Sequence, residues 1–363
     1  MPNKIVYLAV AGAGKTYSIC HNLDLTKRSL ILSFTNENIL NLSREVINNF
    51  GYIPDNIKIM TFDSFKLNYF IWPFISRIKM DFFKMPITNN HYISLIKERY
   101  NPEKKYKESK SNKLHYFIRN GNDYLLKLDK VSELILYHEF KFLNSKTLFE
   151  VGIDRVNYFY DNIYIDEFQD YRESNYDLIC TIAKNVNNIF LYGDYYQHSV
   201  SGQNNSGKPF SKSTLIKFKK EIKKQGFNID EETLNKTRRC SKEVCEFVRE
   251  NLNINIYHDQ QMGRIGVVQY IFNPTQLKSI LIDEDSKVIV REKNVYSKGI
   301  TFGLAKGNTY NSVIVVLPKK AIKNKKICIE DIAESTLNKI YVGITRSTGN
   351  VYLTDEKTIK QLE

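Results

Sequence analysis

The stretch Ala9-Val10-Ala11-Gly12-Ala13-Gly14-Lys15-Thr16 decides the fold, because it separates two segments of different pattern. Residues 4–10 are apolar and β-prone and predict a buried strand, whereas residues 15–23 predict a helix. The small residues between them allow consecutive backbone N–H groups to wrap around phosphate oxygens. The stretch therefore predicts a phosphate-binding loop. The alternative is a glycine-rich turn with a chance GKT, which the strand–turn–helix context disfavours.

Individual residues of this loop predict distinct contacts with a nucleotide. The backbone of Gly12, Ala13 and Gly14 would surround phosphate oxygens. The Lys15 ammonium would reach the β- and γ-phosphates, and the Thr16 hydroxyl would bind Mg²⁺. ATP and Mg²⁺ are therefore the predicted cofactors.

The alternation of strand and helix continues outward from the loop. Buried strands are predicted at residues 29–34, 57–62, 162–165, 188–192, 265–271, 287–290, 312–317 and 350–353. Such alternation is typical of an α/β protein with mainly parallel sheets flanked by helices. A polar, glycine-rich stretch at 201–213 predicts a linker. We expect a first domain at 1–210 and a second at 211–363.

Residues 72–150 break the pattern and predict a helical insertion in the first domain. Residues 77–150 hold 15 Lys and Arg against 9 Asp and Glu, and residues 101–113 predict an exposed loop. Two interpretations stay open. Lys104, Lys105 and Lys107 would contact phosphates of a duplex or a partner, or the insertion is a solvated subdomain that covers the first sheet.

Charge and cysteine usage narrow the partners and the compartment. The 363 residues carry a formal charge of +13, which favours a polyanion such as nucleic acid, although an AT-rich genome also gives a Lys-rich composition. The five cysteines lack zinc spacing, which predicts reduced thiols in a cytoplasmic protein. Without an apolar run of 18 residues or a signal peptide, neither a membrane span nor secretion is expected.

Three further segments carry chemistry. The apolar strand 162–165 ends in Asp166 and Glu167, where Asp166 would hold Mg²⁺ and Glu167 would orient and deprotonate the attacking water. Gln197, beyond the strand at 188–192, can hydrogen-bond a γ-phosphate. Arg239 and Arg346 could stabilise charge on the γ-phosphoryl group from across a cleft. Taken singly, each of these has a bland alternative, such as an ordinary turn or a surface arginine.

Eight segments in one order resemble the motifs of a known family. They read AVAGAGKT, SFTN, TFDSF, IDEFQD, GDYYQ, TRRC, AKGNTY and YVGITRS. This series resembles that of superfamily 1A DNA helicases of the UvrD/Rep type, over most of the chain outside residues 72–150. The resemblance implies two RecA-like P-loop domains, ATP in the cleft between them and single-stranded DNA across the top. Cycles of closure and opening would step the domains along the strand.

The resemblance also implies roles by position. Gln197, Arg239 and Arg346 would contact the γ-phosphate, and Arg238 would stack on the base of the nucleotide. The residues that would contact single-stranded DNA are Thr35, Asn36, Thr61, Phe62, Phe65, Lys306 and Thr309. Lys306, Gly307 and Thr309 match the motif that couples the second domain to DNA and nucleotide.

The chain departs from the family pattern at several positions. It begins directly at the loop strand, without the segment that carries an adenine-reading glutamine. Arg238 stands where the family has a tyrosine that stacks on adenine, although a guanidinium can stack as well. His198 replaces an aromatic residue that stacks on a DNA base, a contact worth roughly 1–3 kcal/mol. Lys306 follows Arg239 by only 67 positions, which leaves no room for a large second insertion.

These features predict a nucleic-acid-stimulated ATPase that translocates on single-stranded DNA, with duplex DNA or RNA as alternative substrates. Duplex unwinding would be a further step beyond ATP hydrolysis and translocation. The main alternative is a nucleotide-gated regulatory subunit with a nuclease partner, because the compact form loosely resembles UvrD-like subunits of Gabija-type antiphage systems. A small-molecule kinase is a third alternative, which the ordered motifs disfavour.

Overall fold

The computed structural model describes residues 3–84, 94–96, 112–120, 123–138, 141, 145–198, 207–210, 214–282, 286–330 and 332–362. Residues 101–111 of the predicted loop, with Lys104, Lys105 and Lys107, lie outside the described residues. So do most of the predicted linker and residues 199–202 after His198.

The chain forms two compact units that interleave along the sequence. The first comprises Met1–Lys4, Ile19–Asp166 and Tyr171–Phe190, and the second comprises Ile5–Ser18, Glu167–Asp170 and Leu191–Glu363. The phosphate-binding loop and Glu167 therefore belong to the same unit as the C-terminal half. The division at residue 210, which rests on the composition of the linker, stays a proposal.

The first sheet has six strands in the order β3-β2-β7-β8-β1-β9. The pairs β2/β3, β2/β7 and β1/β9 are parallel, and every residue of β2 is buried. Near-continuous apolar strands of this kind are typical of parallel sheets covered on both faces. The strands are β1 (Asn3–Leu8), β2 (Ser29–Ser33), β3 (Ile57–Thr61), β7 (Asn162–Ile165), β8 (Asn188–Gly193) and β9 (Asn228–Asp230).

The connections between these strands are short helices with defined ends. The segment α2 begins where the Thr35 side chain accepts a hydrogen bond from the Asn38 N–H, and it ends at Gly51 in a left-handed conformation. The helical segments are α1 (Lys15–His21), α2 (Asn36–Phe50), α3 (Phe62–Lys66), η1 (Leu67–Ile71), η5 (Phe168–Asp170), α8 (Glu173–Asn185), η6 (Tyr195–Gln197) and α9 (Leu215–Lys224).

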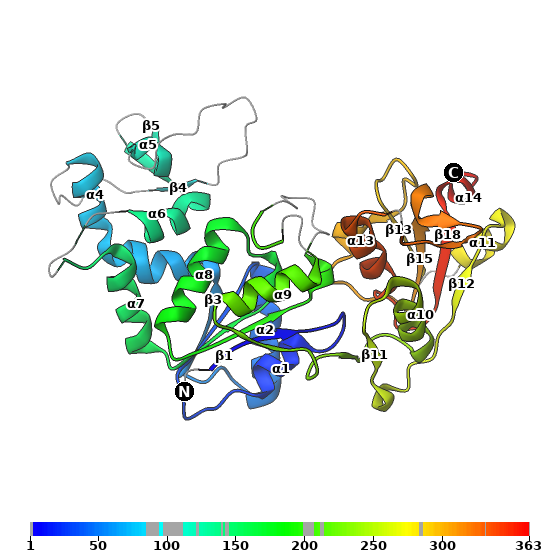
Figure 1. The fold of residues 1–363 in the computed structure, drawn as a ribbon, viewed down its shortest axis with the longest axis horizontal. Helices are drawn as coiled ribbons and strands as arrows, with labels where there is room; N and C mark the ends of the chain where they lie inside the picture. Colours follow the sequence, from blue (N-terminus) through cyan, green and yellow to red (C-terminus); the bar gives the residue numbers. More distant parts are fainter. Residues whose placement is uncertain are drawn as a thin grey trace. The chain divides into compact units, whose positions relative to one another are not determined.

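The described residues of the insertion form helices, α4 and α6 among them (Figure 1), and a small sheet of order β4-β6-β5 that the pattern did not predict. Phe117 and Leu126 pair across β5 and β6 and are fully buried. This tertiary burial outweighs the weak local strand signal. The segments are η2 (Trp72–Phe74), α4 (Ile75–Phe83), β4 (Ser94–Ile96), α5 (Lys113–Tyr116), β5 (Phe117–Asn120), β6 (Asp123–Lys127), η3 (Leu128–Lys130), α6 (Val131–Tyr137) and α7 (Leu148–Phe159).

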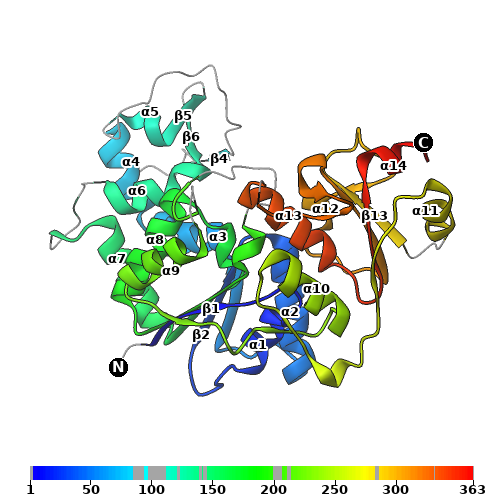
Figure 2. The ribbon, with the colours of Figure 1, turned by 45° about the vertical axis from the view of Figure 1, so that its right-hand side comes forward.

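The second sheet lies in the second unit, with five strands in the order β12-β18-β15-β13-β14, all joined by parallel pairs. Its strands are β12 (Val268–Tyr270), β13 (Ser286–Val290), β14 (Ile300–Thr301), β15 (Ser312–Leu317) and β18 (Val351–Asp355). Its helices are α10 (Lys242–Leu252), α11 (Pro274–Leu281), α12 (Phe302–Ala305), α13 (Glu334–Ile344) and α14 (Glu356–Lys360). Figure 2 shows α12 and α13 beside β13.

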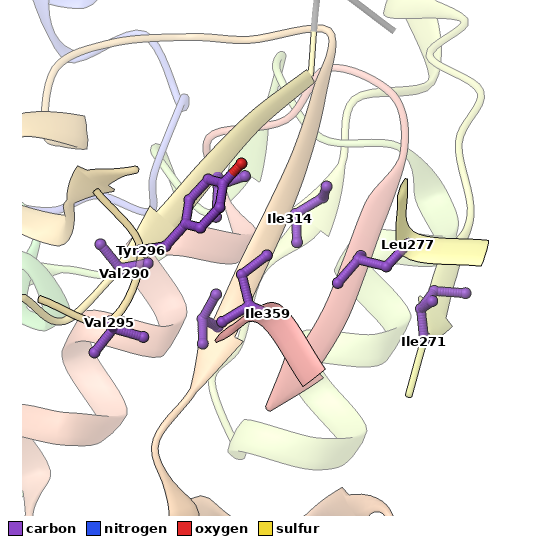
Figure 3. Packing of buried hydrophobic residues seen from close by; sticks show 9 residues of the cluster. Ile271, Leu277, Val290, Val295, Tyr296, Ile314 and Ile359 are labelled. Atoms are coloured by element: carbon purple, nitrogen blue, oxygen red, sulfur yellow. The ribbon is translucent and has the colours of Figure 1, made fainter. Parts of the chain in front are cut away.

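Alternate residues of β15 face opposite sides of this sheet. Ile314 and Val316 belong to one apolar cluster with Leu277 of α11 and Ile359 of α14 (Figure 3). On the other side, a Cβ added to Gly343 of α13 would lie 3.1 Å from the Val315 side chain. The period of two along the strand thus places helices on both faces and brings α13 close to the sheet.

Smaller elements complete the second unit: β10 (Lys236–Thr237), β11 (Tyr257–His258), η7 (Gln260–Met262), η8 (Lys319–Ala321), β16 (Ile322–Lys323) and β17 (Lys326–Ile327). In the described part of the chain, no helix is both long and apolar enough to cross a membrane.

Candidate active site

The loop between β1 and α1 requires glycine at two positions. Gly12 and Gly14 have φ values of +73° and +82°, a region that side chains rarely adopt. A Cβ on Gly12 would lie 2.7 Å from both Thr237 Oγ1 and Arg239 Cβ. The Arg238 N–H donates to the Gly12 carbonyl at 2.9 Å. The loop therefore runs directly against the segment that carries the two adjacent arginines.

Lys15, the first residue of α1, forms an ion pair with Glu167. The Lys15 Nζ lies 3.5 Å from the Glu167 Oε1, and the two side chains are 12% and 21% exposed. Burial would raise the pKa of Glu167, but attraction to Lys15 and Lys306 and a hydrogen bond from Gln169 outweigh it and lower this pKa to about 2. The Glu167 carboxylate is therefore ionised at neutral pH.

Glu167 also has an unusual backbone conformation. Its φ of +52° lies in the left-handed region, which costs a residue other than glycine about 1–3 kcal/mol. The residue follows Asp166 directly, so the strain turns the chain sharply beyond the end of β7. Strain of this kind is concentrated at functional sites.

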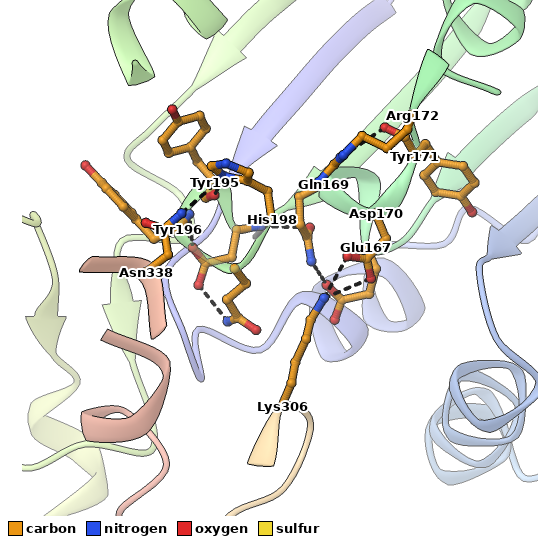
Figure 4. Close-up of polar contacts among 12 residues, drawn as sticks. Glu167, Gln169, Asp170, Tyr171, Arg172, Tyr195, Tyr196, His198, Lys306 and Asn338 are labelled. Carbon is orange, nitrogen blue, oxygen red and sulfur yellow. Dashed lines mark hydrogen bonds and ion pairs between the residues drawn. The ribbon is translucent and has the colours of Figure 1, made fainter. Parts of the chain in front are cut away.

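Lys306 forms an ion pair with Asp170, the last residue of η5 (Figure 4). Its Nζ donates to the two carboxylate oxygens of Asp170 at 2.7 and 2.9 Å. Both side chains are partly buried, with 14% and 18% exposed. The structure thus brings Lys306 to the residues after β7.

Asp194 connects the predicted sensor Gln197 to this cluster. Its buried carboxylate accepts a hydrogen bond from the Gln197 Nε2 at 2.7 Å, and its backbone N–H donates to the Gln169 Oε1 at 3.0 Å. The Gln169 amide in turn donates to the Glu167 carboxylate. Burial raises the pKa of Asp194. A continuous set of contacts therefore runs from Lys15 to Gln197.

The two predicted catalytic arginines lie close together in the second unit. The Arg239 Nη1 donates to the Thr345 carbonyl at 3.2 Å, and the Arg346 Nε donates to the Val342 carbonyl at 3.1 Å. Arg346 is only 2% exposed, and its Nη2 has no hydrogen-bond partner among the described residues. Burial and the charge of Arg239 lower the pKa of Arg346 to about 10. Two adjacent guanidinium groups of this kind favour an anionic ligand.

Arg238, predicted to stack on the base, is stacked on a tyrosine. Its guanidinium carbon lies 4.5 Å from the centre of the Tyr17 ring. Its Nε lies 3.6 Å from a carboxylate oxygen of Asp259. Arg238 and Tyr17 are both exposed, so an aromatic–guanidinium pair lies beside the phosphate-binding loop.

The two predicted Mg²⁺ ligands lie next to the ends of regular elements, Thr16 near the start of α1 and Asp166 just after the end of β7. Thr16 is in the first turn of α1, in the second unit. Asp166 follows β7 in the first unit, is 3% exposed, and donates its backbone N–H to the Leu32 carbonyl at 2.8 Å. A hydroxyl and a carboxylate are the oxygen ligands that Mg²⁺ prefers beside substrate phosphates. The side-chain chemistry of each residue, taken by itself, therefore suits this metal. Among the described residues no group of three His, Cys, Asp or Glu could hold a metal, and this binding mode requires none.

Residues 141–355 match the model of the viral superfamily 1 RNA helicase core domain, which is more than half of the chain. The chain belongs to this helicase family. The matched region contains Asp166, Gln197, Arg239 and Arg346, and the phosphate-binding loop precedes it. No curated protein matches the helicase chain in sequence.

Solved viral helicase structures are also similar to this helicase core. The PRRSV helicase matches with a TM-score of 0.46 and 12% identity, over 99% of this chain and 53% of that one. Arterivirus nonstructural protein 10 (helicase) in a complex with DNA matches with a TM-score of 0.45 and 12% identity, over 97% and 60%. The chain thus spans little more than half the length of these proteins.

The residues expected to contact the nucleic-acid strand have structural tasks in this helicase core. Thr35 caps α2, and the Thr61 side chain accepts a hydrogen bond from the Ser64 N–H at 3.1 Å. Phe62 and Phe65 are 2% and 0% exposed. The Phe62 ring packs edge-on against Tyr171 with centroids 5.0 Å apart. Both rings therefore belong to the core of the first unit.

The other residues expected to contact the nucleic-acid strand are more exposed to solvent. Asn36 begins α2 and is exposed, and Thr309 is exposed near the bridge between Tyr310 and Ser347. Lys306 is held by Asp170, as described above. The roles of all these residues in binding a strand stay proposals.

Sequence reasoning missed several residues of the helicase site. Gln169, Asp170 and Asp194 lie within the quoted motifs, after the carboxyl ends of β7 and β8, which is where ligands bind in parallel sheets. Tyr341 precedes Arg346 by about one and a half helical turns, and its ring gives no polar signal in the sequence. Phe34 directly follows β2 and is 48% exposed, with its ring edge-on to Tyr171.

Proposed function

We propose that the chain hydrolyses ATP and uses the cycle to translocate on single-stranded DNA, with duplex unwinding as a further step. The observation that supports this best is the continuous contact between Lys15, Glu167 and Gln169, extended through Asp194 to Gln197. It joins a phosphate-binding lysine, a carboxylate and a γ-phosphate sensor, which are the groups that phosphoryl transfer requires.

Each group has a distinct role in the proposed reaction. The Lys15 ammonium would neutralise the β- and γ-phosphates, and Glu167 would orient the attacking water and accept its proton. Arg239 and Arg346 would stabilise the charge that develops on the γ-phosphoryl group, an effect worth about 10³–10⁵ in rate. Mg²⁺ bound through Thr16 and Asp166 would supply further charge neutralisation. The backbone of Gly12, Ala13 and Gly14 would enclose the phosphates.

Within superfamily 1 we propose the UvrD/Rep type, on the order of the eight motifs. The base of the nucleotide would stack on the Arg238 guanidinium beside Tyr17. Stacking has little base selectivity because every base has a π-face. We therefore expect GTP to support turnover almost as well as ATP.

The strand itself is proposed to be DNA, with RNA as the competing substrate. The family model is described as an RNA helicase core, and one similar solved structure is a helicase in a complex with DNA. Translocation would depend on Lys306, Thr309 and the residues that follow β2 and β3. A phosphate of the strand would compete with Asp170 for the Lys306 ammonium.

A second candidate is a regulatory subunit of a nuclease-containing antiphage complex without unwinding of its own. One observation favours it: His198, where the family commonly presents an aromatic to a base, is 5% exposed and stacks on Phe210 at 4.8 Å. The ring therefore offers no free face to a base. Such a subunit would hydrolyse ATP without displacing a strand.

The decisive experiment measures ATP turnover of the purified chain without nucleic acid and with single-stranded DNA or RNA of equal length. Strong stimulation by DNA would support the translocase, and a strand-displacement assay would follow. Turnover that ignores both nucleic acids would overturn the translocase proposal. Turnover with stimulation but no displacement would favour the regulatory subunit.

The Lys15→Ala variant establishes that the turnover comes from this site. Loss of one positioned donor to a transferring phosphoryl group lowers kcat by about 10²- to 10³-fold, while strand affinity should be retained. Lys58→Ala, on an exposed position of β3, is the matched control. Normal turnover by Lys15→Ala would show that the phosphate-binding loop has been misassigned.

A further inference from the structure

One buried hydroxyl joins three of the segments that form the proposed site. The side chain of Tyr341 is fully buried on α13. Its hydroxyl accepts a hydrogen bond from the Ala11 backbone N–H at 2.8 Å and donates to the Asp194 Oδ2 at 3.2 Å. Ala11 lies in the phosphate-binding loop, and Asp194 carries the sensor Gln197. All of these residues belong to the second unit.

The C-terminal end of α13 also contacts both predicted catalytic arginines. The Tyr341 carbonyl accepts hydrogen bonds from the Thr345 N–H and Oγ1 at 3.0 and 2.8 Å, and the Thr345 carbonyl accepts from Arg239. Arg346 follows Thr345 and is tied to the helix through the Val342 carbonyl. Tyr341 therefore contacts the loop through its hydroxyl and, through its carbonyl, Thr345, which accepts a hydrogen bond from Arg239 and precedes Arg346.

We propose that Tyr341 is a positioning residue. It would keep the phosphate-binding loop, the sensor Gln197 and the two arginines in the relative positions that hydrolysis requires. Because its hydroxyl is buried and bonded to Ala11 and Asp194, it would act through these residues rather than on the nucleotide itself. Its hydroxyl acts through Asp194, whose Oδ2 accepts from both Tyr341 and the Gln197 Nε2. Loss of the hydroxyl would leave a buried N–H and a buried carboxylate short of a partner, so the segments would relax relative to one another. This inference rests on the proposed ATP hydrolysis.

The test is Tyr341→Phe, which keeps the ring and its packing and removes only the hydroxyl. We expect kcat to fall roughly 10- to 100-fold, because small misplacements of catalytic groups cost about this much. The KM for ATP should change by less than about threefold, because the phosphate contacts themselves remain. The matched control is Tyr116→Phe in the insertion, whose buried hydroxyl has no hydrogen-bond partner among the described residues.

A double-mutant cycle separates positioning from general damage. If the hydroxyl acts through Gln197, Tyr341→Phe should have little effect on kcat in a Gln197→Ala background, because groups that act as a unit are not additive. Fully additive losses would overturn the proposed route. Unchanged kcat in Tyr341→Phe would overturn the proposal altogether. So would a lower thermal midpoint with normal turnover per folded molecule.

Amide hydrogen exchange of the peptide that contains Ala11 provides a readout independent of activity. Tyr341→Phe should accelerate exchange there, and Tyr116→Phe should not. If the wild-type chain hydrolyses no ATP with any nucleic acid, the proposed function fails while this exchange still tests the contact. Unaltered exchange at Ala11 would then overturn the role of Tyr341. Accelerated exchange together with normal kcat would reduce Tyr341 to a structural residue.

Discussion

The residues predicted to bind the nucleotide and those predicted to bind the nucleic-acid strand differ in the contacts that they make in the structure. In the second unit, an ion pair joins Lys15 to Glu167, and hydrogen bonds through Gln169 and Asp194 connect Glu167 to Gln197. In the first unit, Thr35 caps a helix and Phe62 lies in an aromatic core. A motif can therefore mark a place in the fold as well as a contact with a ligand. Capping and burial of motif residues show that they also stabilise the fold of their own unit.

The largest effect expected from this difference is on Phe62. Phe62→Ala should lower the free energy of unfolding by about 3–5 kcal/mol, because the ring is buried and the change leaves a cavity. Urea unfolding monitored by circular dichroism measures it. The exposed Phe34 provides the matched control, since Phe34→Ala should change stability by less than about 0.5 kcal/mol.

The same pair of variants also tests strand binding. If exposed rings beside the sheet stack on bases, Phe34→Ala should weaken binding of a single-stranded oligonucleotide by about 1–3 kcal/mol. Phe62→Leu, which keeps most of the core volume, should leave that affinity unchanged. Loss of affinity in Phe62→Leu with normal stability would show that Phe62 contacts the nucleic-acid strand. It would contradict the purely structural role assigned to this ring.

A smaller effect is expected at the helix cap. Thr35→Ala removes the side-chain acceptor of the Asn38 N–H and should cost about 1 kcal/mol of stability. Thr35→Ser keeps the acceptor and should restore it. A strand affinity that follows the same order as stability would indicate an indirect role for Thr35. Equal stability of both variants would show that the cap contributes nothing measurable.

The α/β fold and its strand positions could be predicted because apolar runs and the loop glycines leave strong local signals. The strands at 162–165 and 312–317 match the structure at both ends. The predicted strand at 265–271 shortens to β12 (Val268–Tyr270), where only three residues pair with β18. Pairing partners set the ends of short strands, and a single sequence does not contain them.

The contacts within the site were harder to predict than its members. Lys15, Glu167 and Gln197 are recognisable from local motifs, but the bond from Tyr341 to Ala11 spans 330 positions. The ion pair of Lys306 with Asp170 spans 136. Such pairs depend on tertiary packing, which no periodicity reports. The small sheet of the insertion was missed for the same reason, because Phe117 and Leu126 form it by mutual burial.

The smallest expected effect is on the pH dependence of stability, and it tests the aromatic packing around His138 in the first unit. His138 lies 4.4 Å from the Phe82 ring centre, and burial lowers the pKa of this histidine from 6.5 to about 4, against a small opposing effect of Asp81. The unfolded chain binds this proton first as pH falls. The contribution of His138 to stability is therefore complete above pH 6.5 and is lost progressively as pH falls to about 4. Partial exposure and solvent screening keep the effect small.

The measurement is the thermal midpoint between pH 7 and pH 4, where His138→Gln should give a shallower decline than the wild type because glutamine does not titrate. Identical slopes would mean that the His138 imidazole is not shielded from water by its aromatic neighbours.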